Sequence, residues 1–494
     1  MNLTGKSLIA GQWLAEDGAT SYQAYSPLDD SYLSQQYFYV SEGLLNQAAE
    51  AADNAFFQYA ETTNEQRAEF LDTIAEQILA LGDELLEVTH LETALPLARL
   101  TGERGRTMNQ LKLFASKLRS GLDMDINEAA DPARQPLPKP ETKLQYLAVG
   151  PVAVFGASNF PYAFSVPGGD TASALAAGCP VIAKGHPAHP GTSELMALAI
   201  AKAVEICGLP AGVFSMLQSA ERSISHQLVM HPAIKAVGFT GSFNVASSLQ
   251  SSIDKRVERI PLYGELGSIN PQVILPQKGE QEAKALADAL VPSLVLGQGQ
   301  FCTNPGLWLV PESCQEFLRL SGEAIAQQAA GPLLTKGILN SYRSGVEQLN
   351  NAANVECLGT GQTGAAHHVS ANLFKTDATT FINNHNLHEE VFGPCGLVVT
   401  YKDEQELTAI IGVLTGQLTA SILATEDELA QQSTLVNQLK YKVGRLIFNQ
   451  MPTGVEVCYS MNHGGPFPAT TDVRSTSVGT EAMKRFLRPV CLQR

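Results

Sequence analysis

The sequence lacks the features that mark several large classes of protein. Its 494 residues include 33 lysines and arginines against 49 aspartates and glutamates, which leaves a net charge of −16 with histidine neutral. This deficit of positive charge argues against a nucleic-acid-binding protein, because the phosphates of nucleic acids attract basic surfaces. The longest apolar stretches, such as residues 285–296, carry charge or proline and are shorter than the about 20 residues that span a bilayer. The sequence therefore predicts no membrane span.

Patterns typical of secretion, disulfide frameworks and metal sites are also missing. The first residues contain no basic segment followed by an apolar one, so we expect no secretory signal. The eight cysteines include no C-x-x-C pair, and the ten histidines include no H-E-x-x-H motif. We therefore expect reduced thiols, a cytoplasmic location and no catalytic metal.

What is present is the composition of a globular chain, with 44% hydrophobic and 17% charged residues. Helical patterns occupy much of the first 130 residues, because the segments 47–59, 65–80 and 82–95 repeat apolar residues three and four positions apart. The proline-rich stretch 132–141 cannot continue a helix and predicts an extended surface connector.

From residue 147 onward, short apolar runs alternate with helical segments. The expected strands are 152–155, 180–183, 213–217 and 236–239, and the expected helices are 171–177, 193–206, 225–230 and 245–253. Four strand–helix repeats predict a parallel sheet with helices on both faces, which binds ligands beyond the carboxyl ends of its strands. Beyond Gly264 we expect a second α/β unit, with strands at 272–275, 307–310, 396–400 and 446–448.

One dinucleotide-binding fingerprint, Gly359-Thr-Gly361-Gln-Thr-Gly364, stands outside its usual context. That motif works where a strand leads into it and a helix opens from it, so that backbone N–H groups meet a pyrophosphate. Here no amphipathic helix follows and no acidic residue stands about 20 positions further on. We interpret the motif as a glycine turn.

The ends of the predicted strands are better candidates for a site. Asn159 lies just after the first strand, Lys184 after the second, and Gly241-Ser242 after the fourth, before a helix whose free N–H groups suit a phosphate. An ordinary loop role remains the alternative for each residue taken alone, but all of them share one edge of the sheet.

Two further residues have settings that favour chemistry. Cys302 stands in Gly297-Gln-Gly-Gln-Phe-Cys302, where small and polar residues allow a sharp turn around a thiol, whereas the other cysteines fit inert packing. Glu265 is flanked by glycines at the predicted domain boundary, where enclosure raises a carboxyl pKa and suits a base near neutrality; a surface glutamate is the alternative.

At this point several segments together carry a family resemblance. They are Gly156-Ala-Ser-Asn-Phe-Pro161, Phe239-Thr-Gly-Ser242, Gly264-Glu-Leu-Gly267, Gly299-Gln-Phe-Cys302 and Glu389-Glu-Val-Phe-Gly-Pro394. In this order they resemble the NAD(P)-dependent aldehyde dehydrogenase superfamily over almost the whole chain. Residues 102–107, 168–180 and 184–193 are most similar to the NADP-preferring α-ketoglutaric semialdehyde (2,5-dioxopentanoate) dehydrogenases. A fatty or general aldehyde dehydrogenase with similar segments is the alternative.

The resemblance implies an α/β fold with three parts. A Rossmann-type parallel-sheet cofactor domain is expected over 1–264, with an extended oligomerisation segment at 131–149 inside it. An α/β catalytic domain is expected over 265–465, and a C-terminal return segment over 466–494. The resemblance further implies a homodimer or homotetramer.

The resemblance also implies the roles of the site residues. Cys302 is the nucleophile that forms a thiohemiacetal and then a thioester, Asn159 donates to the oxyanion, and Glu265 activates water. Lys184 is expected at the adenosine ribose, and Gly241 with Ser242 at the pyrophosphate. Glu390 and Phe392 are expected at the nicotinamide ribose and ring, and Gly267 is a further expected cofactor-binding residue.

Cofactor and substrate preferences follow from charge. NAD-preferring relatives often place a glutamate three residues beyond the lysine, whereas this chain has Pro187 there, so nothing repels a 2′-phosphate. Arg222 is the candidate cation for that phosphate, with a solvated surface arginine as the alternative, so we expect NADP to be preferred and NAD to be possible. Phe160 and Phe164 are expected to line the substrate tunnel. Arg106 either holds a substrate carboxylate or forms a structural ion pair.

Two rival functions belong to other classes. A non-catalytic structural protein on this fold would be expected to lose the nucleophile, whereas Cys302, Glu265 and Asn159 are all present. A cofactor-independent thiol hydrolase would pair Cys302 with a histidine base, but no histidine lies near it in the sequence and none can be nominated. We therefore expect an oxidoreductase acting on a small aldehyde.

Overall fold

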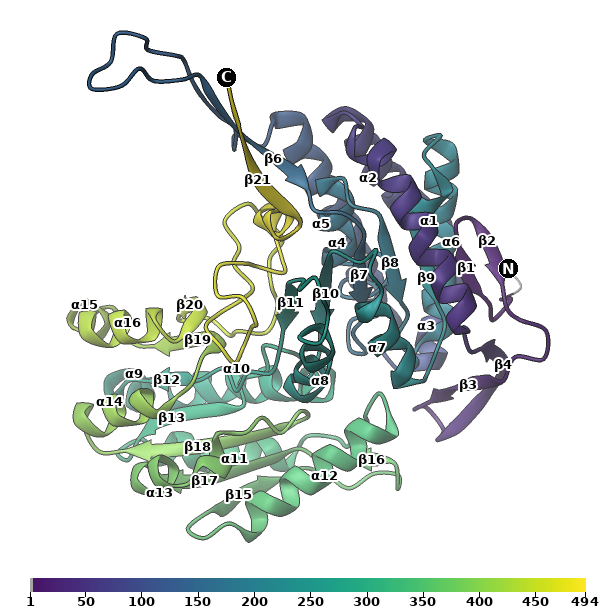
Figure 1. The fold of residues 1–494 in the computed structure, drawn as a ribbon. Helices are drawn as coiled ribbons and strands as arrows, with labels where there is room; N and C mark the ends of the chain where they lie inside the picture. The colour runs from purple at the N-terminus through teal and green to yellow at the C-terminus, as the bar shows by residue number, and fades with distance from the viewer. Residues whose placement is uncertain (1–2) are drawn as a thin grey trace.

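The computed structural model describes residues 3–494 (Figure 1). Two seven-stranded sheets form two lobes, drawn in purple to teal and in teal to yellow-green, and a three-stranded sheet projects from the first lobe. Within the described residues, no helix is long and apolar enough to cross a membrane.

The first sheet contains the predicted strand–helix repeats. Its parallel strands are β7 (Val152–Phe155), β8 (Val181–Lys184), β9 (Phe214–Leu217), β10 (Ala236–Thr240) and β11 (Leu262–Glu265), in the order β11-β10-β7-β8-β9. The helices that follow them are α5 (Gly169–Ala177), α6 (Pro190–Ile206), α7 (Arg222–Met230) and α8 (Phe243–Ile253), and a short η1 (Ala211–Val213) precedes β9. The predicted repeats are confirmed, with element ends displaced by a few residues. All five parallel strands therefore end at one edge.

The first forty residues were predicted incompletely, because they form strands that the helical reading of the N-terminal region did not include. These strands are β1 (Ser7–Ile9) and β2 (Gln12–Leu14), which extend the first sheet beyond β9, and the hairpin of β3 (Ser21–Ser26) with β4 (Ser31–Phe38). They are short, and their polar residues hide the alternation that marks a strand. The helices after them are α1 (Glu42–Ala60), α2 (Asn64–Ala80), α3 (Gly82–Thr93) and α4 (Leu97–Ser120).

The second sheet has the order β15-β17-β18-β13-β12-β19-β20. Its strands are β12 (Gln272–Ile274), β13 (Leu307–Pro311), β15 (Glu356–Thr360), β17 (Asn372–Asp377), β18 (Cys395–Tyr401), β19 (Gln417–Leu423) and β20 (Val443–Phe448), parallel except for β15. Its helices are α9 (Pro276–Gln281), α10 (Ala283–Val295), α11 (Gln315–Ala326), α12 (Lys336–Asn351), α13 (Ala378–Asn383), α14 (Glu404–Val413), α15 (Glu426–Gln431) and α16 (Ser433–Lys440). The short helices η2 (Leu296–Gly299) and η3 (His385–His388) lie in its loops.

The four predicted strands of this unit are confirmed, while β15, β17 and β19 were not predicted. The fingerprint at 359–364 begins at the end of β15 and continues as a loop towards β16 (His368–Val369), which pairs with β14 (Gly331–Pro332). No helix opens from it, as the sequence predicted.

The chain leaves the second sheet after Phe448 and returns between the two lobes (Figure 1). There it runs along β11, where the Leu266 N–H donates to the Ala469 carbonyl at 2.8 Å and the Gly264 N–H to Thr471 Oγ1 at 2.7 Å. This return places residues from the end of the sequence beside the end of β11.

The last elements attach to the first lobe. Within η4 (Thr480–Phe486), Arg485 forms a buried ion pair with Asp170 of α5 at 2.7 Å. Then β21 (Leu487–Gln493) pairs antiparallel with β6 (Thr142–Ala148), whose other neighbour is β5 (Ile126–Glu128). The loop between β5 and β6 extends away from the body of the molecule (Figure 1).

Candidate active site

Cys302 lies at the end of a tight loop that only glycine-rich sequence permits. Gly297, Gln298 and Gly299 all have positive φ angles, at 57°, 56° and 66°. A Cβ on Gly299 would lie 2.2 Å from the backbone of Gly393, so a side chain there would clash. The loop is anchored at its far end, where Asn270 Nδ2 donates to the Cys302 carbonyl at 2.9 Å. The thiol is thus held by backbone geometry.

Two ionisable side chains lie beside that thiol. Glu265, at the end of β11, and His463, from the returning chain, contact each other, with 3.1 Å between Oε2 and Nε2. His463 Nε2 also lies 3.4 Å from Cys302 Sγ. Ser477 Oγ donates to the same Glu265 oxygen at 3.1 Å. A thiol, an imidazole and a carboxylate therefore meet where the two lobes join.

The pKa of Glu265 differs from the sequence expectation of a raised value. Burial raises it, but the charge interaction and hydrogen bond with His463, together with hydrogen bonds from Ser477 and Cys302, outweigh burial, so the pKa is lowered. The expectation was wrong because His463 and Ser477 are distant in sequence. For Cys302 the shift is opposite, since burial and the negative charge of Glu265 raise the thiol pKa well above its ordinary value.

Asn159 follows β7 and lies near the cysteine loop. Its side chain is buried, and Nδ2 donates to the carbonyl of Gln300, two residues before Cys302, at 3.0 Å. Arg99 Nη2 fixes the other side of this residue by donating to the Asn159 carbonyl at 2.6 Å. The amide is positioned beside the loop that carries the thiol.

A cavity of about 230 Å³ opens onto Cys302. Phe160, Phe164 and Phe301 line it, with ring centroids 5.4 Å apart for Phe160 and Phe164 and 5.2 Å apart for Phe160 and Phe301. Val455 also lines it. The walls suit the carbon chain of a small aldehyde.

Arg106, on α4, brings a positive charge into this apolar cavity. Its Nε donates to the Val455 carbonyl at 3.4 Å, and its guanidinium lies 5.2 Å from the Phe164 ring centroid. Nη1 and Nη2 are buried and have no partner in the part of the chain that the structure describes. Glu103, one turn earlier on α4, interacts electrostatically with this arginine, but no carboxylate among residues 3–494 lies within salt-bridge distance of it.

The predicted cofactor residues lie along the carboxyl edge of the first sheet. Lys184 ends β8, and its buried ammonium has no hydrogen-bond partner among residues 3–494, so burial lowers its pKa to about 8. Beside it in the sheet, β9 leads to Arg222, the exposed first residue of α7. Ser242 is the N-cap of α8 and makes no side-chain capping bond, and Gly241 precedes it. An unpaired lysine and an open helix N-terminus fit a dinucleotide.

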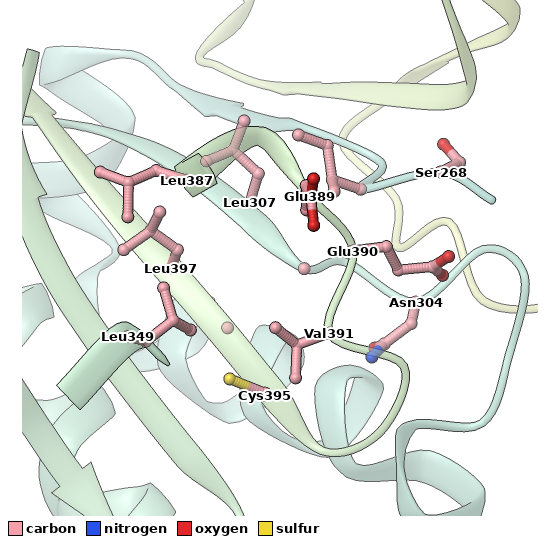
Figure 2. Close-up of a pocket in the computed structure, with 13 residues that line it drawn as sticks. Ser268, Asn304, Leu307, Leu349, Leu387, Glu389, Glu390, Val391, Cys395 and Leu397 are labelled. Atoms are coloured by element: carbon pink, nitrogen blue, oxygen red, sulfur yellow. The ribbon is translucent and has the colours of Figure 1, made fainter. Parts of the chain in front are cut away.

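The other end of this edge reaches the second lobe. A Cβ on Gly267 would lie 2.6 Å from Glu390 Oε2, so the glycine admits that carboxylate. The Glu390 side chain is exposed to the cleft, and the protein around it, together with the negative charge of Glu265, raises its carboxyl pKa above the ordinary value. Figure 2 shows Glu390 with Ser268 and Asn304 at the polar side of a small pocket whose other side is lined by leucines. Phe392 is half-buried in the same loop.

His463 is the functional side chain that sequence reasoning missed. It lies 161 residues from Cys302, in Asn462-His-Gly-Gly465, which matches none of the motifs considered. The statement that no histidine could be nominated as a partner of the thiol is therefore wrong. Only the path of the returning chain reveals this contact.

Fold and site together define a class: a two-lobed α/β enzyme with a dinucleotide-binding edge and a half-buried thiol where the lobes meet. The model of the aldehyde dehydrogenase family matches residues 13–488, and the chain belongs to that family. It is an enzyme of a family that uses NAD(P).

The relatives agree with this assignment. The chain is 45% identical over 498 aligned positions to alpha-ketoglutaric semialdehyde dehydrogenase 2 of Azospirillum brasilense, covering 100% of this chain and 95% of the relative. It is 43% identical to alpha-ketoglutaric semialdehyde dehydrogenase of Acinetobacter baylyi, covering 99% and 93%. The aldehyde dehydrogenase KauB of Pseudomonas aeruginosa shares the fold, with a TM-score of 0.86 at 21% identity, covering 100% of this chain and 97% of that one.

Proposed function

We propose that this enzyme oxidises 2,5-dioxopentanoate (α-ketoglutaric semialdehyde) to the dicarboxylate, with NADP⁺ as the preferred oxidant. The unpartnered guanidinium of Arg106 in the cavity at Cys302 is the observation that carries the substrate assignment. A buried cation without a partner is costly, and a substrate carboxylate would satisfy both free nitrogens in a bidentate contact. The two relatives with 45% and 43% identity bear the name of this activity.

A second arginine supports an acidic substrate. Nη1 of Arg99 lines the same cavity, is buried, and has no partner within the described residues. The cavity holds one carboxylate, Glu103, whose Oε1 accepts from the Tyr162 and Ala163 N–H groups at 2.8 and 3.0 Å. Two guanidinium groups against one carboxylate leave the pocket positive. A purely apolar substrate would leave Nη1 of Arg99 and both Nη atoms of Arg106 without a hydrogen-bond acceptor.

The residues at the reacting end divide the chemistry among them. Cys302 Sγ attacks the aldehyde carbon, and the Asn159 amide with the Cys302 N–H would face the oxyanion; loss of one such donor costs about 3 kcal/mol of transition-state stabilisation. Bound nicotinamide supplies a hydride acceptor. Glu265, ionised because its pKa is lowered, takes a proton from the water that hydrolyses the thioester.

For the cofactor, we propose that Lys184 holds the adenosine ribose, Gly241 and Ser242 the pyrophosphate, and Gly267, Glu390 and Phe392 the nicotinamide end. NADP preference is supported by charge. Pro187 stands three residues beyond Lys184, so no carboxylate repels a 2′-phosphate there. Arg222 is exposed at the same edge of the sheet, one strand away. Equal or better kcat/KM with NAD⁺ would contradict this part of the proposal.

The substrate proposal is tested with a panel of aldehydes. We expect 2,5-dioxopentanoate to be oxidised with a kcat/KM at least about tenfold above that of hexanal, because one charge-assisted contact contributes about 1.5–3 kcal/mol. Succinic semialdehyde separates a need for the carboxylate from a need for the ketone. A marked preference for hexanal would favour the alternative, a fatty or general aldehyde dehydrogenase, to which the three phenylalanines of the cavity are suited.

We also propose the domain roles: cofactor binding by 1–264, catalysis by 265–465, and oligomerisation by 131–149 and 466–494. A homodimer or homotetramer is supported by apolar side chains exposed around β6 and β21, with Phe57 75% and Leu492 43% exposed. Light scattering coupled to gel filtration tests this, and a monomer at micromolar concentration would contradict it. A cytoplasmic location is supported by eight cysteines that are all free.

A further inference from the structure

His463 contacts both groups that carry the proposed chemistry, yet the mechanism above gives it no task. Its ring is fully buried, and Nε2 lies 3.4 Å from Cys302 Sγ and 3.1 Å from Glu265 Oε2. The sulfur, the nitrogen and a carboxylate oxygen all lie within 4.8 Å of one another. These distances allow a proton to pass between the groups without movement of the backbone.

The returning chain holds this imidazole in place. The His463 N–H donates to Thr476 Oγ1 at 2.8 Å, and the His463 carbonyl accepts from the Ser477 N–H at 2.9 Å. Phe164 packs nearby, with its ring centroid 6.0 Å from that of the histidine. The ring is therefore positioned by contacts separate from those that position Cys302.

The surroundings of Cys302 create a need for such a group. Burial and the charge of Glu265 both raise the pKa of the thiol, while the thiolate is the form that attacks a carbonyl. Removing the proton to Nε2 would create a cation between two anions, the thiolate and the Glu265 carboxylate. That arrangement offsets the charge that otherwise opposes ionisation of the sulfur.

We propose that His463 is a catalytic base that takes the Cys302 proton during attack and returns it when the thioester is hydrolysed. In attack, the S–H bond breaks, an N–H bond forms at Nε2, the sulfur electron pair forms the C–S bond, and the carbonyl π pair moves to oxygen. In hydrolysis, the C–S bond breaks, its electron pair returns to sulfur, and the proton moves from Nε2 to Sγ. Glu265 then acts as a base only for the water that hydrolyses the thioester.

The unsatisfied side of the ring is compatible with this role. Nδ1 is buried without a partner in the described part of the chain. The contacts that lower the pKa of Glu265 place an N–H on Nε2 and direct the thiol at the carboxylate. Transfer to Nε2 therefore proceeds from the other neutral tautomer, in which the thiol donates to Nε2 and the proton is on Nδ1, so that the Nδ1–H lacks a partner both before and after transfer. Protonation of Nε2 adds no further unpaired donor. The new N–H points at the Glu265 carboxylate, where the unprotonated nitrogen presented a lone pair.

The experiment must consider the other charges near the sulfur. Glu265 and Glu390 raise the pKa of Cys302, and Arg106 lowers it. Arg445 of β20 also interacts with Cys302. Burial lowers the pKa of this arginine, and the interaction with Cys302 partly offsets that effect. Variants at position 463 keep these four residues but remove a contact that lowers the pKa of Glu265. The same variants are therefore also measured in a Glu265→Gln background, where a change in pH dependence reports on the imidazole.

The test is the rate at which iodoacetamide alkylates Cys302, followed by mass spectrometry of the peptide that contains it, over about pH 6 to 10. For His463→Asn and His463→Gln we expect alkylation about 100-fold slower at pH 7, with the difference shrinking as pH rises, because the thiol then ionises unaided. His90→Asn is the matched control, since His90 lies on α3, contacts the carbonyl of Leu95 just beyond that helix and does not line the cavity at Cys302. Equal slowing at every pH, or no slowing, would overturn the proposal.

The unmodified enzyme supplies a second measurement that needs no variant. With His463 as base, its alkylation rate should level off below the pKa of about 8.5 of a free thiol. A rate that climbs tenfold per pH unit up to high pH would contradict the inference. The proposed role of His463 rests on the proposed function, but different results would refute the two. Aldehyde oxidation by Cys302→Ala would refute the thioester route, whereas the alkylation rates alone decide the role of His463.

Discussion

The charged side chains at the two ends of the active-site cavity differ in whether they have hydrogen-bond partners. At the reacting end, Glu265 is hydrogen-bonded by Ser477 and contacts His463, both at 3.1 Å. At the substrate end, Nη1 and Nη2 of Arg106 have no partner among residues 3–494. Groups that are paired with one another determine where protons lie, whereas an unpaired cation is suited to an incoming anion. Substitutions at the first end should therefore slow every aldehyde, and those at the second only acidic ones.

The largest effect should come from the sulfur itself. Cys302→Ala should lower kcat/KM by about 10⁴-fold or more for both 2,5-dioxopentanoate and hexanal, because no other group can form the thioester. Formation of NADPH, followed by absorbance, measures this loss. Cys357→Ala, which removes an exposed free thiol, is the control and should retain full activity. Oxidation by Cys302→Ala at the parental rate would refute the assignment of the nucleophile.

Glu265→Gln should come next, with steady-state turnover about 10³-fold lower, since a carboxamide cannot accept a proton from water. Hydride transfer does not need that proton transfer, so a burst of one NADPH per active site should remain. Intact-protein mass spectrometry should detect the acyl group on Cys302. A variant without a burst would mean that Glu265 acts before the thioester forms.

The pH dependence of the parent enzyme tests the same carboxylate. Because the pKa of Glu265 is lowered, its base form is present above that value and is lost only as the pH falls through it. Deacylation in single-turnover experiments should therefore stay constant down to about pH 4.3, the ordinary value for glutamate. Loss of deacylation with an apparent pKa near 6 would restore the sequence expectation of a raised value.

At the substrate end, Arg106→Met should be selective. We expect kcat/KM for 2,5-dioxopentanoate to fall about 10- to 150-fold, which corresponds to about 1.5–3 kcal/mol for a charge-assisted contact. Hexanal should change less than about threefold. Lys112→Gln, which removes an exposed charge from the same helix, is the matched control. Equal losses of kcat/KM for both aldehydes would contradict the assignment of Arg106 to recognition of the substrate carboxylate.

The smallest effect concerns a third buried charge, Lys184. Burial lowers its pKa to about 8, so the ammonium is charged below that pH and loses its proton above it. The KM for NADP⁺ should therefore rise severalfold between about pH 7 and 9. Lys184→Arg should flatten this rise, because a guanidinium stays charged. A KM for NADP⁺ that is independent of pH in the parent enzyme would indicate that cofactor affinity does not depend on the charge of this ammonium.

Local patterns were sufficient for much of the fold. The repeat from β7 to α8 follows from apolar runs and helix starts that lie within a few residues of one another, and its elements were predicted correctly. Strands β1 to β4 and β19 were not, because polar strands at an edge and short buried runs lack a distinctive period. For the site, Cys302, Glu265 and Asn159 stand in recognisable segments of the family.

The sequence by itself determined the family, the identity of the thiol, and the edge of the sheet at which ligands are expected. Tertiary structure alone decided what surrounds the thiol. Contact with His463 and Ser477 depends on the return of the chain along β11, and that contact reverses the expected pKa shift of Glu265. That both Nη atoms of Arg106 are buried without a hydrogen-bond partner likewise becomes apparent only in the folded chain. Charge interactions act over a few ångströms of space irrespective of separation along the chain, so only the folded coordinates contain them.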